Sequence, residues 1–506
     1  MHPADLIVLV VYLALVVVIG RSFGAAQRTM QDYFVSGHRL PAWAIMGSIV
    51  ATETSTVTFI SIPGFAYTTN FTFLQLVVGY LLGRVVVSAL LIPAYFRGDV
   101  LTAYQLLGTR FGATTKRLAS SVFIATRTLA DGFRLFATGL MLAAVLGLAG
   151  GGGLRVSRLL PFLPEDVALL TMSIIVIAVV TLLYTYGGGM TAVVWTDVAQ
   201  LVVYLGGALF AAAILLGEIP GGWGEVSRVA GAAGRFQVFD FTWDVTRGYT
   251  FWSGVIGGMF LTTATHGTDQ MLVQRYLCAR SVRDARAALL WSGVVVFVQF
   301  VLFLVIGAML FVYYTQHAPG EIAAFTVDGR IAGDRVFPFF VVRHLPPGLV
   351  GLVLAAVLAA AMSTLSSSLN SSAAAVMGDF VVPWRGDRMS EDQKLALSRR
   401  LTLLFGVLQA VAALAALALS RRVVDEVLGI AAFTSGLILG LFLLGTLTTR
   451  VRERGALVGL ATGTVVMLWV KLGTATTWQW YVVIGSVVTF GVGVLASMVL
   501  EPDRAR

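Results

Sequence analysis

Long apolar stretches alternate with short polar segments along the whole chain. About thirteen of these stretches reach the roughly 20 residues that an α-helix needs to cross the hydrocarbon core of a bilayer. They lie at residues 4–20, 43–66, 73–96, 118–149, 165–186, 190–216, 249–268, 285–314, 347–376, 398–420, 424–446, 455–473 and 477–500. The pattern predicts an all-α protein of the lipid bilayer with about 13 transmembrane helices.

Two of the apolar stretches are interrupted by hydroxyl groups, charge, Gly or Pro. The first contains Ala-Thr-Glu-Thr-Ser-Thr-Val-Thr at 51–58, followed by Pro63-Gly64, and the second contains Thr-Thr-Ala-Thr-His-Gly-Thr-Asp-Gln at 262–270. Because Ser and Thr compete for backbone groups and Pro removes a donor, both predict discontinuous helices whose freed carbonyls line a cavity. A kinked helix with back-bonded threonines is the alternative for the first stretch.

The two interruptions lie five spans apart, which is the spacing of an inverted five-helix repeat. We therefore expect one transmembrane domain over 1–506, with a first repeat at 43–216 and a second at 249–446. The leading helix 4–20 precedes the repeats, and two trailing helices at 455–500 follow them.

A neutral polar stripe follows one helix face within residues 354–372. At helical spacing it contains Ala360, Ser363, Thr364, Ser367, Asn370 and Ser371. Buried hydroxyls need partners in hydrocarbon, and a dehydrated alkali cation, which prefers oxygen ligands, is one candidate. Close packing of Ser and Ala, with hydrogen bonds to the helix's own carbonyls, is the other.

The composition narrows the class of protein further. The chain is 58% hydrophobic and 12% charged, whereas soluble domains carry about 25% charged residues. More than half of its 35 Lys and Arg residues fall after the odd-numbered spans or in the C-terminal tail, which predicts an N-terminus outside and a cytoplasmic C-terminus. The formal charge of +9 then faces anionic lipid, so no nucleic acid is expected as a partner. The single cysteine excludes a multi-cysteine metal site, and the extramembrane segments are too short for a catalytic domain.

Ionisable side chains within the spans are functional candidates, because charge is costly in the membrane. Arg127, Asp131 and Arg134 are spaced i, i+4, i+7 and share one helix face. We expect Asp131 to pair with one or both arginines, or to leave Arg134 available to clamp a substrate carboxylate. Asp197 is a further candidate, and His266 is either a hydrogen-bonded structural group or a pH sensor.

Three segments carry a family resemblance. They are Tyr184-Thr-x-Gly-Gly followed by Ala192-Val-x-x-Thr196-Asp197-x-x-Gln200, then Thr268-Asp-Gln-Met-x-Val-Gln-Arg275, and the Ser/Ala helix 354–372. Together they closely resemble the sodium/solute symporter family, over nearly the whole chain. The resemblance implies a leucine-transporter-type inverted repeat of 5+5 core helices, with one leading and two trailing helices.

The resemblance also implies two sodium sites. The first would use the carbonyls of Ala51, Thr54 and Ala360 with the hydroxyls of Ser363 and Thr364. A second, found in some members of the family, would use Asp197 with the hydroxyls of Ser363, Ser366 and Ser367. Na⁺ is the only ion that the resemblance implies.

The substrate contacts that the resemblance implies lie beside the first interruption. They map to Glu53, Ser55, Thr58, Gln75, Arg134, Thr262 and Phe433. Arg134 suggests an organic anion, as in sialic acid carriers of the family. Glu53 departs from the family pattern and would neutralise Arg134, accept hydrogen bonds from sugar hydroxyls or bind an amine.

The function implied is secondary active transport rather than catalysis. We expect sodium-coupled symport of a small polar solute (an organic acid, sugar acid or sugar) into the cell by alternating access. The protein would be a multi-pass protein of the inner (plasma) membrane and would work as a monomer. Two alternatives stay open: a proton-coupled carrier in which Glu53, Asp197 or His266 titrates, and a transporter-like sensor.

Overall fold

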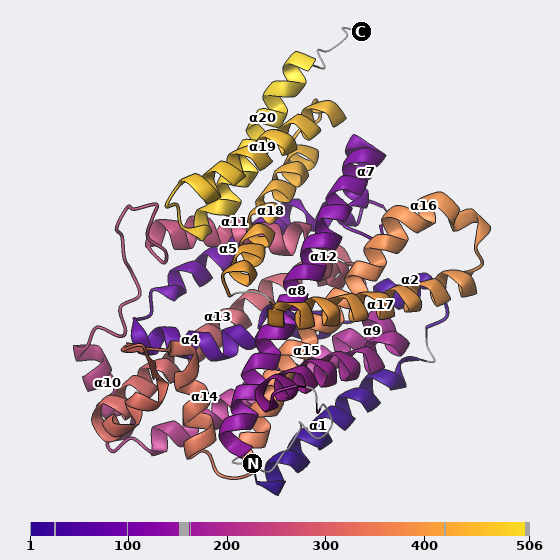
Figure 1. Cartoon of the computed structure of the whole chain (residues 1–506). Coiled ribbons are helices and arrows are strands. Elements are labelled where there is room, and N and C mark those ends of the chain that lie inside the picture. Colours follow the sequence, from indigo (N-terminus) through magenta and orange to yellow (C-terminus); the bar gives the residue numbers. More distant parts are fainter. Residues whose placement is uncertain are drawn as a thin grey trace.

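A computed structural model describes residues 2–24, 27–98, 100–150, 161, 163–418 and 421–500. The ends of the expected domain 1–506, residues 1 and 501–506, lie outside the described residues, as do 419–420 of the span 398–420. The described chain is predominantly helical (Figure 1), which confirms the predicted class. Its strands are β1 (Thr326–Val327) and β2 (Arg330–Ile331), which pair as a short antiparallel hairpin.

Each predicted apolar stretch contains a helix, and shorter helices lie between the stretches. The helices up to the end of the expected first repeat are α1 (Pro3–Ser22), α2 (Met30–Val35), α3 (Ala42–Glu53), α4 (Thr56–Thr68), α5 (Phe73–Leu90), α6 (Ile92–Tyr95), α7 (Gln105–Phe111), α8 (Ala113–Gly150) and α9 (Glu165–Gly217). The remaining ones are α10 (Gly222–Ala232), α11 (Phe251–Thr268), α12 (Gln270–Leu277), α13 (Val282–Val312), α14 (Gly333–His344), α15 (Leu349–Val376), α16 (Val382–Arg385), α17 (Glu391–Ala415), α18 (Arg421–Leu447), α19 (Glu453–Gly473) and α20 (Tyr481–Leu500).

Two of these stretches break where the polar residues interrupt them. Between α3 and α4 the backbone is extended at Thr54 and Ser55, and the helix axis turns by 60°. Between α11 and α12 it is extended at Asp269. The last carbonyls of α3 and α11 therefore lack part of their helical hydrogen bonds and become available to other groups.

The long helix α9 covers two predicted spans, 165–186 and 190–216. It bends at Gly189, where φ is 55° and a Cβ would lie 2.5 Å from the carbonyl oxygen of Tyr33. Among the described residues, eight helices are long and apolar enough to cross a membrane, and the bent pair α3–α4 gives a ninth. The count of about 13 crossings and the side on which each terminus lies stay predictions.

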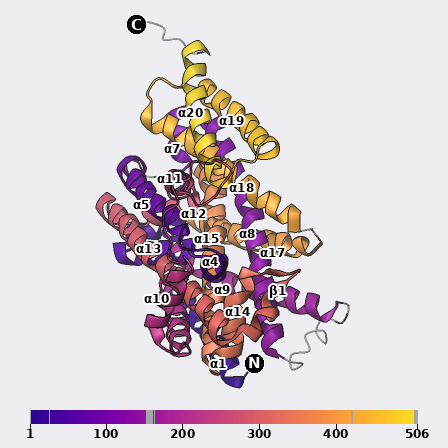
Figure 2. The ribbon, with the colours of Figure 1, turned by 90° about the vertical axis from the view of Figure 1, so that its left-hand side faces the viewer.

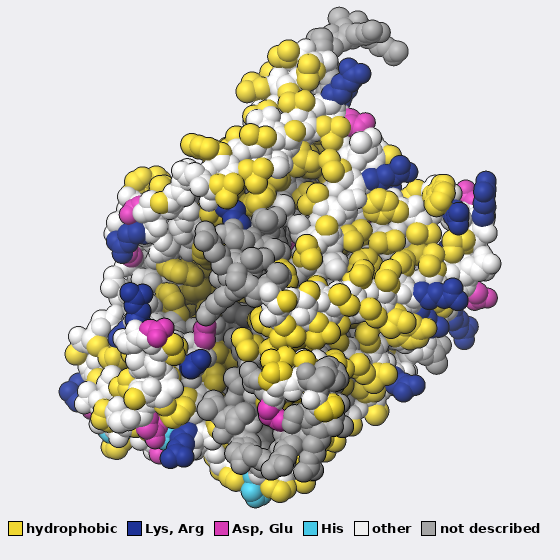
Figure 3. Space-filling view, in the orientation of Figure 1, with side chains coloured by type: hydrophobic (Ala, Val, Ile, Leu, Met, Phe, Trp, Pro, Cys, Tyr) yellow, Lys and Arg dark blue, Asp and Glu magenta, His cyan; other side chains and the backbone are white. Residues whose placement is uncertain are grey.

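The polar helix α15 lies in the middle of the bundle, packed against α1, α3, α8, α9 and α17. Figure 2 shows α18, α19 and α20 grouped at one end of the molecule, where α20 packs against both of the others. Hydrophobic side chains cover much of the face seen in Figure 3. Large apolar side chains such as Leu403 and Val407 of α17 are about half exposed. A bilayer would cover such a surface, because soluble proteins rarely expose it.

Candidate functional site

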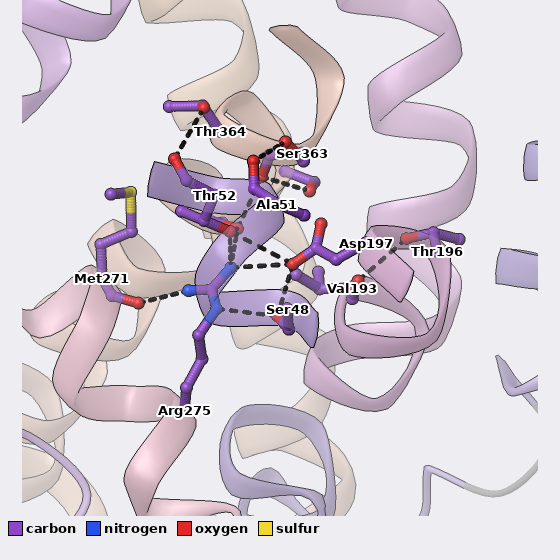
Figure 4. Close-up of polar contacts among 12 residues, drawn as sticks. Ser48, Ala51, Thr52, Val193, Thr196, Asp197, Met271, Arg275, Ser363 and Thr364 are labelled. Carbon is purple, nitrogen blue, oxygen red and sulfur yellow. Dashed lines mark hydrogen bonds and ion pairs between the residues drawn. The ribbon is translucent and has the colours of Figure 1, made fainter. Parts of the chain in front are cut away.

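The polar face of α15 meets the end of α3. Ser363 Oγ donates hydrogen bonds to the carbonyl oxygens of Ala51 (2.9 Å) and Ala360 (3.1 Å). Thr364 Oγ1 donates to those of Thr52 (3.2 Å) and Ala360 (3.3 Å). The carbonyls of Ala51 and Thr52 are free for these bonds because α3 ends at Glu53. Figure 4 shows the resulting cluster of oxygens.

Four of the five residues expected at a first sodium site therefore lie together. The fifth, Thr54, is at the break itself, where its hydroxyl donates to the Val50 carbonyl (2.9 Å) and accepts from Tyr204 (3.1 Å) and Gln299 (2.7 Å). The cluster is buried and consists of carbonyl and hydroxyl oxygens without charge. Oxygen donors of this kind suit a hard cation such as Na⁺.

A buried ion pair lies next to the oxygen cluster, beside the last two turns of α3. Asp197 of α9 and Arg275 of α12 are both fully buried, and Arg275 Nη2 donates to Asp197 Oδ2 at 2.9 Å. The same carboxylate oxygen accepts from Ser48 (2.5 Å) and Thr52 (3.3 Å), while Asp197 Oδ1 has no hydrogen-bond partner among the described residues.

The Arg275 side chain also forms hydrogen bonds to residues of α3, α12 and α15. Its guanidinium donates to Ser48 Oγ of α3 (2.8 Å), to the Met271 carbonyl of α12 (2.5 Å), and to the hydroxyls of Thr52 and Ser367. Sequence reasoning placed Arg275 in a motif but gave it no role. Arg275 lies beside Asp197 because α12 packs against α15 and α3, and this packing could not be predicted from the motif.

The serines expected at a second sodium site are close to the pair. Ser366 and Ser367 both donate to the Ser363 carbonyl, at 3.1 and 2.6 Å. Ser367 also accepts from Arg275. Hydrogen bonds to the helix's own carbonyls, one of the two interpretations of the stripe, are thus present in the same helix that contacts the α3 break.

A hollow opens beside the oxygen cluster. It is bounded by the start of α4, by α8 and by α15, and is lined by Ser55, Thr56, Asp131, Arg134, Leu135, Thr138, Ala360, Ala361, Thr364 and Leu365. Ala360 and Thr364 belong to both the hollow and the cluster. Arg134 is the cation of the lining; its side chain is 44% exposed, and Nη1 donates to Asp131 Oδ1 at 2.7 Å.

Asp131 has a second arginine partner, as the spacing allowed. Arg127 Nη1 lies 3.4 Å from Asp131 Oδ1, and Arg127 Nη2 pairs with Asp269. Asp269 also caps α12 by accepting from the Met271 backbone N–H at 2.9 Å. The carboxylates therefore balance the arginines in this chain of ion pairs, which leads from the second helix break to the hollow.

Glu53 is not part of the hollow lining. It pairs with Arg84 of α5, and His266 Nε2 lies 3.5 Å from the same carboxylate oxygen. Arg84 is anchored by Ser292 Oγ (3.3 Å) and the Tyr80 carbonyl (3.2 Å). Of the alternatives for Glu53, neutralising an arginine describes the observed contact, but the arginine is Arg84 rather than Arg134.

The other expected substrate contacts lie in different environments. Ser55 lines the hollow and caps α4, accepting from the Thr58 backbone N–H at 3.3 Å. Gln75 is buried and donates to the Tyr249 carbonyl (2.8 Å), while its Oε1 accepts from the Asp240 N–H (3.0 Å). Thr262 faces Gly83 of α5, and Phe433 is buried in α18. In this structure, Gln75 therefore holds an extramembrane loop in place.

That loop carries a titratable group outside the membrane-spanning segments. Hydrogen bonds from Thr242 lower the pKa of the Asp240 carboxyl, and Arg247 lowers it further. The Thr242 N–H donates to Asp240 Oδ1 at 3.0 Å, and Arg247 Nη2 lies 3.1 Å from Asp240 Oδ2. The folded loop therefore favours the ionised form of the Asp240 carboxyl.

Comparisons with known proteins point to one family of membrane transporters. The model of the sodium:solute symporter family matches residues 33–154 and 166–463. The sodium/sialic acid symporter NanT of Aliivibrio fischeri is 31% identical over 97% of this chain and 92% of its own. The human sodium/iodide cotransporter is 31% identical over 88% of this chain and 66% of its own. A solved structure of a Na⁺-coupled sialic acid symporter, substrate-bound and outward-open, superposes with a TM-score of 0.84 at 28% identity and covers 98% of both chains.

These relatives are transporters, and the match extends over both helix breaks and α15. They do not favour the proton-coupled carrier or the sensor that the sequence left open. They support Na⁺ as the coupled ion and a small solute as the cargo. The chain belongs to the sodium:solute symporter family and is a sodium-coupled membrane symporter, not an enzyme.

Proposed function

We propose that this symporter carries a small organic anion, a sugar acid or another carboxylate, into the cell and binds it in the hollow beside α15. One observation carries the proposal: Arg134, the half-exposed cation of the lining, shares the hollow with Ala360 and Thr364 of the oxygen cluster. A guanidinium binds a carboxylate through two parallel hydrogen bonds. NanT, a relative over nearly its whole length, is named for sialic acid, which is a sugar acid.

In this proposal Na⁺ binds first, among Ala51, Thr54, Ala360, Ser363 and Thr364. The ion holds the end of α3 against α15 and so fixes the position of Ala360 and Thr364, which also line the hollow. The solute carboxylate then replaces Asp131 at Arg134, while Arg127 continues to balance Asp131. Each ligand favours the state that the other stabilises, which is the thermodynamic basis of coupled transport.

A second Na⁺ would bind at Asp197 with Ser363, Ser366 and Ser367. The free Oδ1 of Asp197 supports this part of the proposal, because a buried carboxylate oxygen without a partner is costly. Each inward positive charge adds about 2.3 kcal/mol per 100 mV of membrane potential to the driving force. Ser55 contributes to the solute site directly. Glu53, Thr58, Gln75, Thr262 and Phe433 would join it only in another state of the transport cycle.

We place the protein in the inner (plasma) membrane, as a monomer with an outside N-terminus and a cytoplasmic C-terminus. One chain contains both helix breaks, the oxygen cluster and the hollow, so a second copy is not required for transport. Rocking of one repeat against the other, 43–216 against 249–446, would expose the sites to each side in turn.

Uptake by the purified protein in vesicles tests the proposal. We expect uptake of radiolabelled N-acetylneuraminate to require an inward Na⁺ gradient, to rise with an inside-negative potential, and to be inhibited by carboxylates more strongly than by neutral sugars. Ser363→Ala should raise the half-saturating Na⁺ concentration about tenfold or more, and Arg134→Gln should abolish the preference for carboxylates.

Arg228→Gln is the matched control for Arg134. Arg228 also pairs with a carboxylate one turn away on the same helix, Glu225 at 2.6 Å, but it lies on α10, outside the hollow. Its substitution should leave uptake unchanged. Uptake driven by a pH step without Na⁺, or a solute preference that Arg134→Gln does not alter, would refute the proposal.

A further inference from the structure

Several buried polar atoms without partners gather between the leading helix α1 and the helices α9 and α15. They are the hydroxyl of Tyr12, both side-chain amide atoms of Gln200 and Oδ1 of Asp197, none of which has a hydrogen-bond partner among the described residues. Tyr12 is 5% exposed, while Gln200 and Asp197 are completely buried. A buried polar atom without a partner costs about 1–3 kcal/mol, so four in one region indicate that a binding partner belongs there.

The geometry of the helices brings these atoms to one place. Gln200 follows Asp197 by three residues on α9 and therefore lies on the same face. The Tyr12 hydroxyl interacts with Gln200, Tyr184 and Asp197, without a bond to any of them that meets hydrogen-bond geometry. Tyr184, whose own hydroxyl donates to the Met362 carbonyl of α15 at 3.0 Å, lies near both Gln200 and Ser366.

The leading helix is held firmly at this place, although it lies outside the two expected repeats. Asp5 Oδ1 accepts from the backbone N–H groups of Gly348 (2.7 Å) and Gly351 (3.0 Å) at the start of α15. At the other end of α1, a Cβ on Gly20 would lie 2.3 Å from Cβ of Tyr184, so the two helices touch directly. Tyr12, halfway between these anchors, therefore has little freedom to turn its hydroxyl elsewhere.

The chemistry of the group favours a monovalent cation. One carboxylate oxygen, an amide oxygen, a phenol oxygen and the nearby Ser366 hydroxyl form an all-oxygen set, which is the preference of a hard ion. Arg275 occupies the other oxygen of Asp197, so the arginine and a cation at Oδ1 bind opposite sides of one carboxylate. Ordered water can complete the coordination, since the site is polar on several sides.

We infer that the second sodium site extends beyond Asp197 and the serines to Gln200 and Tyr12, which makes the leading helix α1 part of the ion site. This inference rests on the proposed function, because it presupposes a second Na⁺ at Asp197. It adds Gln200 of α9 and Tyr12 of a helix outside the repeats, and assigns the leading helix a part in ion binding.

Equilibrium binding of ²²Na⁺ to the purified full chain tests the inference without any solute. We expect two saturable Na⁺ per chain, one of which is lost in Thr364→Ala, because Thr364 belongs only to the first site. Tyr12→Phe and Gln200→Leu should weaken the other site at least fivefold and leave the first unchanged. Gln200→Glu keeps an oxygen at the same position and should retain the affinity. Tyr12→Phe removes a single oxygen and decides the question even where Gln200→Leu fails to fold.

Tyr314→Phe is the matched control, because Tyr314 is also buried with an unpartnered hydroxyl but lies in the segment Tyr313–His317, beyond the end of α13. It should bind Na⁺ as the wild type does. If Asp197→Asn loses the second Na⁺ while Tyr12→Phe and Gln200→Leu keep it, the group holds only water and the inference is wrong. A wild type that binds a single Na⁺, lost in Thr364→Ala, would overturn the proposed second site and this inference together.

Discussion

Substituting Arg275 with Met separates the structural role of this arginine from a role of Asp197 in binding Na⁺. In the folded protein the guanidinium is the only positively charged group in ion-pair contact with Asp197 among the described residues. Met has a similar length and volume, so the change removes the charge and its hydrogen bonds with little loss of packing. Asp197 then keeps only the hydroxyls of Ser48 and Thr52 as donors.

The expected magnitude follows from burial. Both partners are completely buried, and removing one member of a buried pair destabilises a protein by about 3–5 kcal/mol, because the other charge is left uncompensated. A cation that binds only the folded protein raises the free energy of unfolding by about 2.7 kcal/mol when its concentration is 100 times its dissociation constant. Saturating Na⁺ should therefore recover half or more of the lost stability of Arg275→Met.

The assay is thermal unfolding of the purified protein in NaCl and in choline chloride at equal ionic strength. We expect Arg275→Met to melt well below the wild type in choline and to gain more from Na⁺ than the wild type does. Adding Asp197→Asn should remove both the destabilisation and the extra gain. Arg84→Met is the control: it leaves Glu53 without its arginine in the same way, but its loss should not be recovered selectively by Na⁺. Na⁺ stabilisation of Arg275→Met that the added Asp197→Asn does not reduce would refute Na⁺ binding at Asp197.

Three further predictions follow from single contacts. Arg134→Lys should lower carboxylate uptake about tenfold while Arg134→Gln lowers it further, because Lys keeps the charge but not the two-pronged geometry; competition assays in vesicles measure both. Gly307→Ala should destabilise the protein by about 1–3 kcal/mol, because its Cβ would lie 2.2 Å from the Pro63 carbonyl where α13 meets α4; Gly224→Ala on α10, with nothing within 4 Å, should be neutral or stabilising in the same melting assay. The pKa of Asp240 is lowered by folding, so its contribution to stability is complete above the unfolded pKa of about 3.9 and disappears as the pH falls through the folded value. Protease cleavage of the loop 233–250 should therefore rise at pH 3, and Asp240→Asn should cleave alike at pH 3 and pH 6.

Local composition was enough to find the parts of the fold that depend on local chemistry. Apolar stretches of helical length became helices because backbone groups in hydrocarbon must satisfy one another within the segment. The polar interruptions at 51–58 and 262–270 became breaks at Thr54 and Asp269. The resemblance then brought Ala51, Ser363 and Thr364 together correctly, since it transfers contacts between helices that periodicity alone does not contain.

The partners of the long charged side chains depended on the tertiary structure. Glu53 pairs with Arg84, and Asp197 pairs with Arg275, at separations of 31 and 78 residues along the chain. Spacing along one helix predicted only the local contact of Asp131 with its two neighbouring arginines. Gln75 was assigned to the solute and instead contacts Tyr249 and Asp240.

The long apolar helices, the two helix breaks and the polar face of α15 could all be predicted from the amino-acid sequence. These features arise from the cost of leaving backbone or hydroxyl groups unpaired in a bilayer, and that cost is set residue by residue. The packing of the helices was needed to show which arginine balances which carboxylate, and that Tyr12 of the leading helix lies beside Gln200 and Asp197. An arginine side chain can reach several carboxylates, so the choice among them is made by the packing of helices that are distant in sequence.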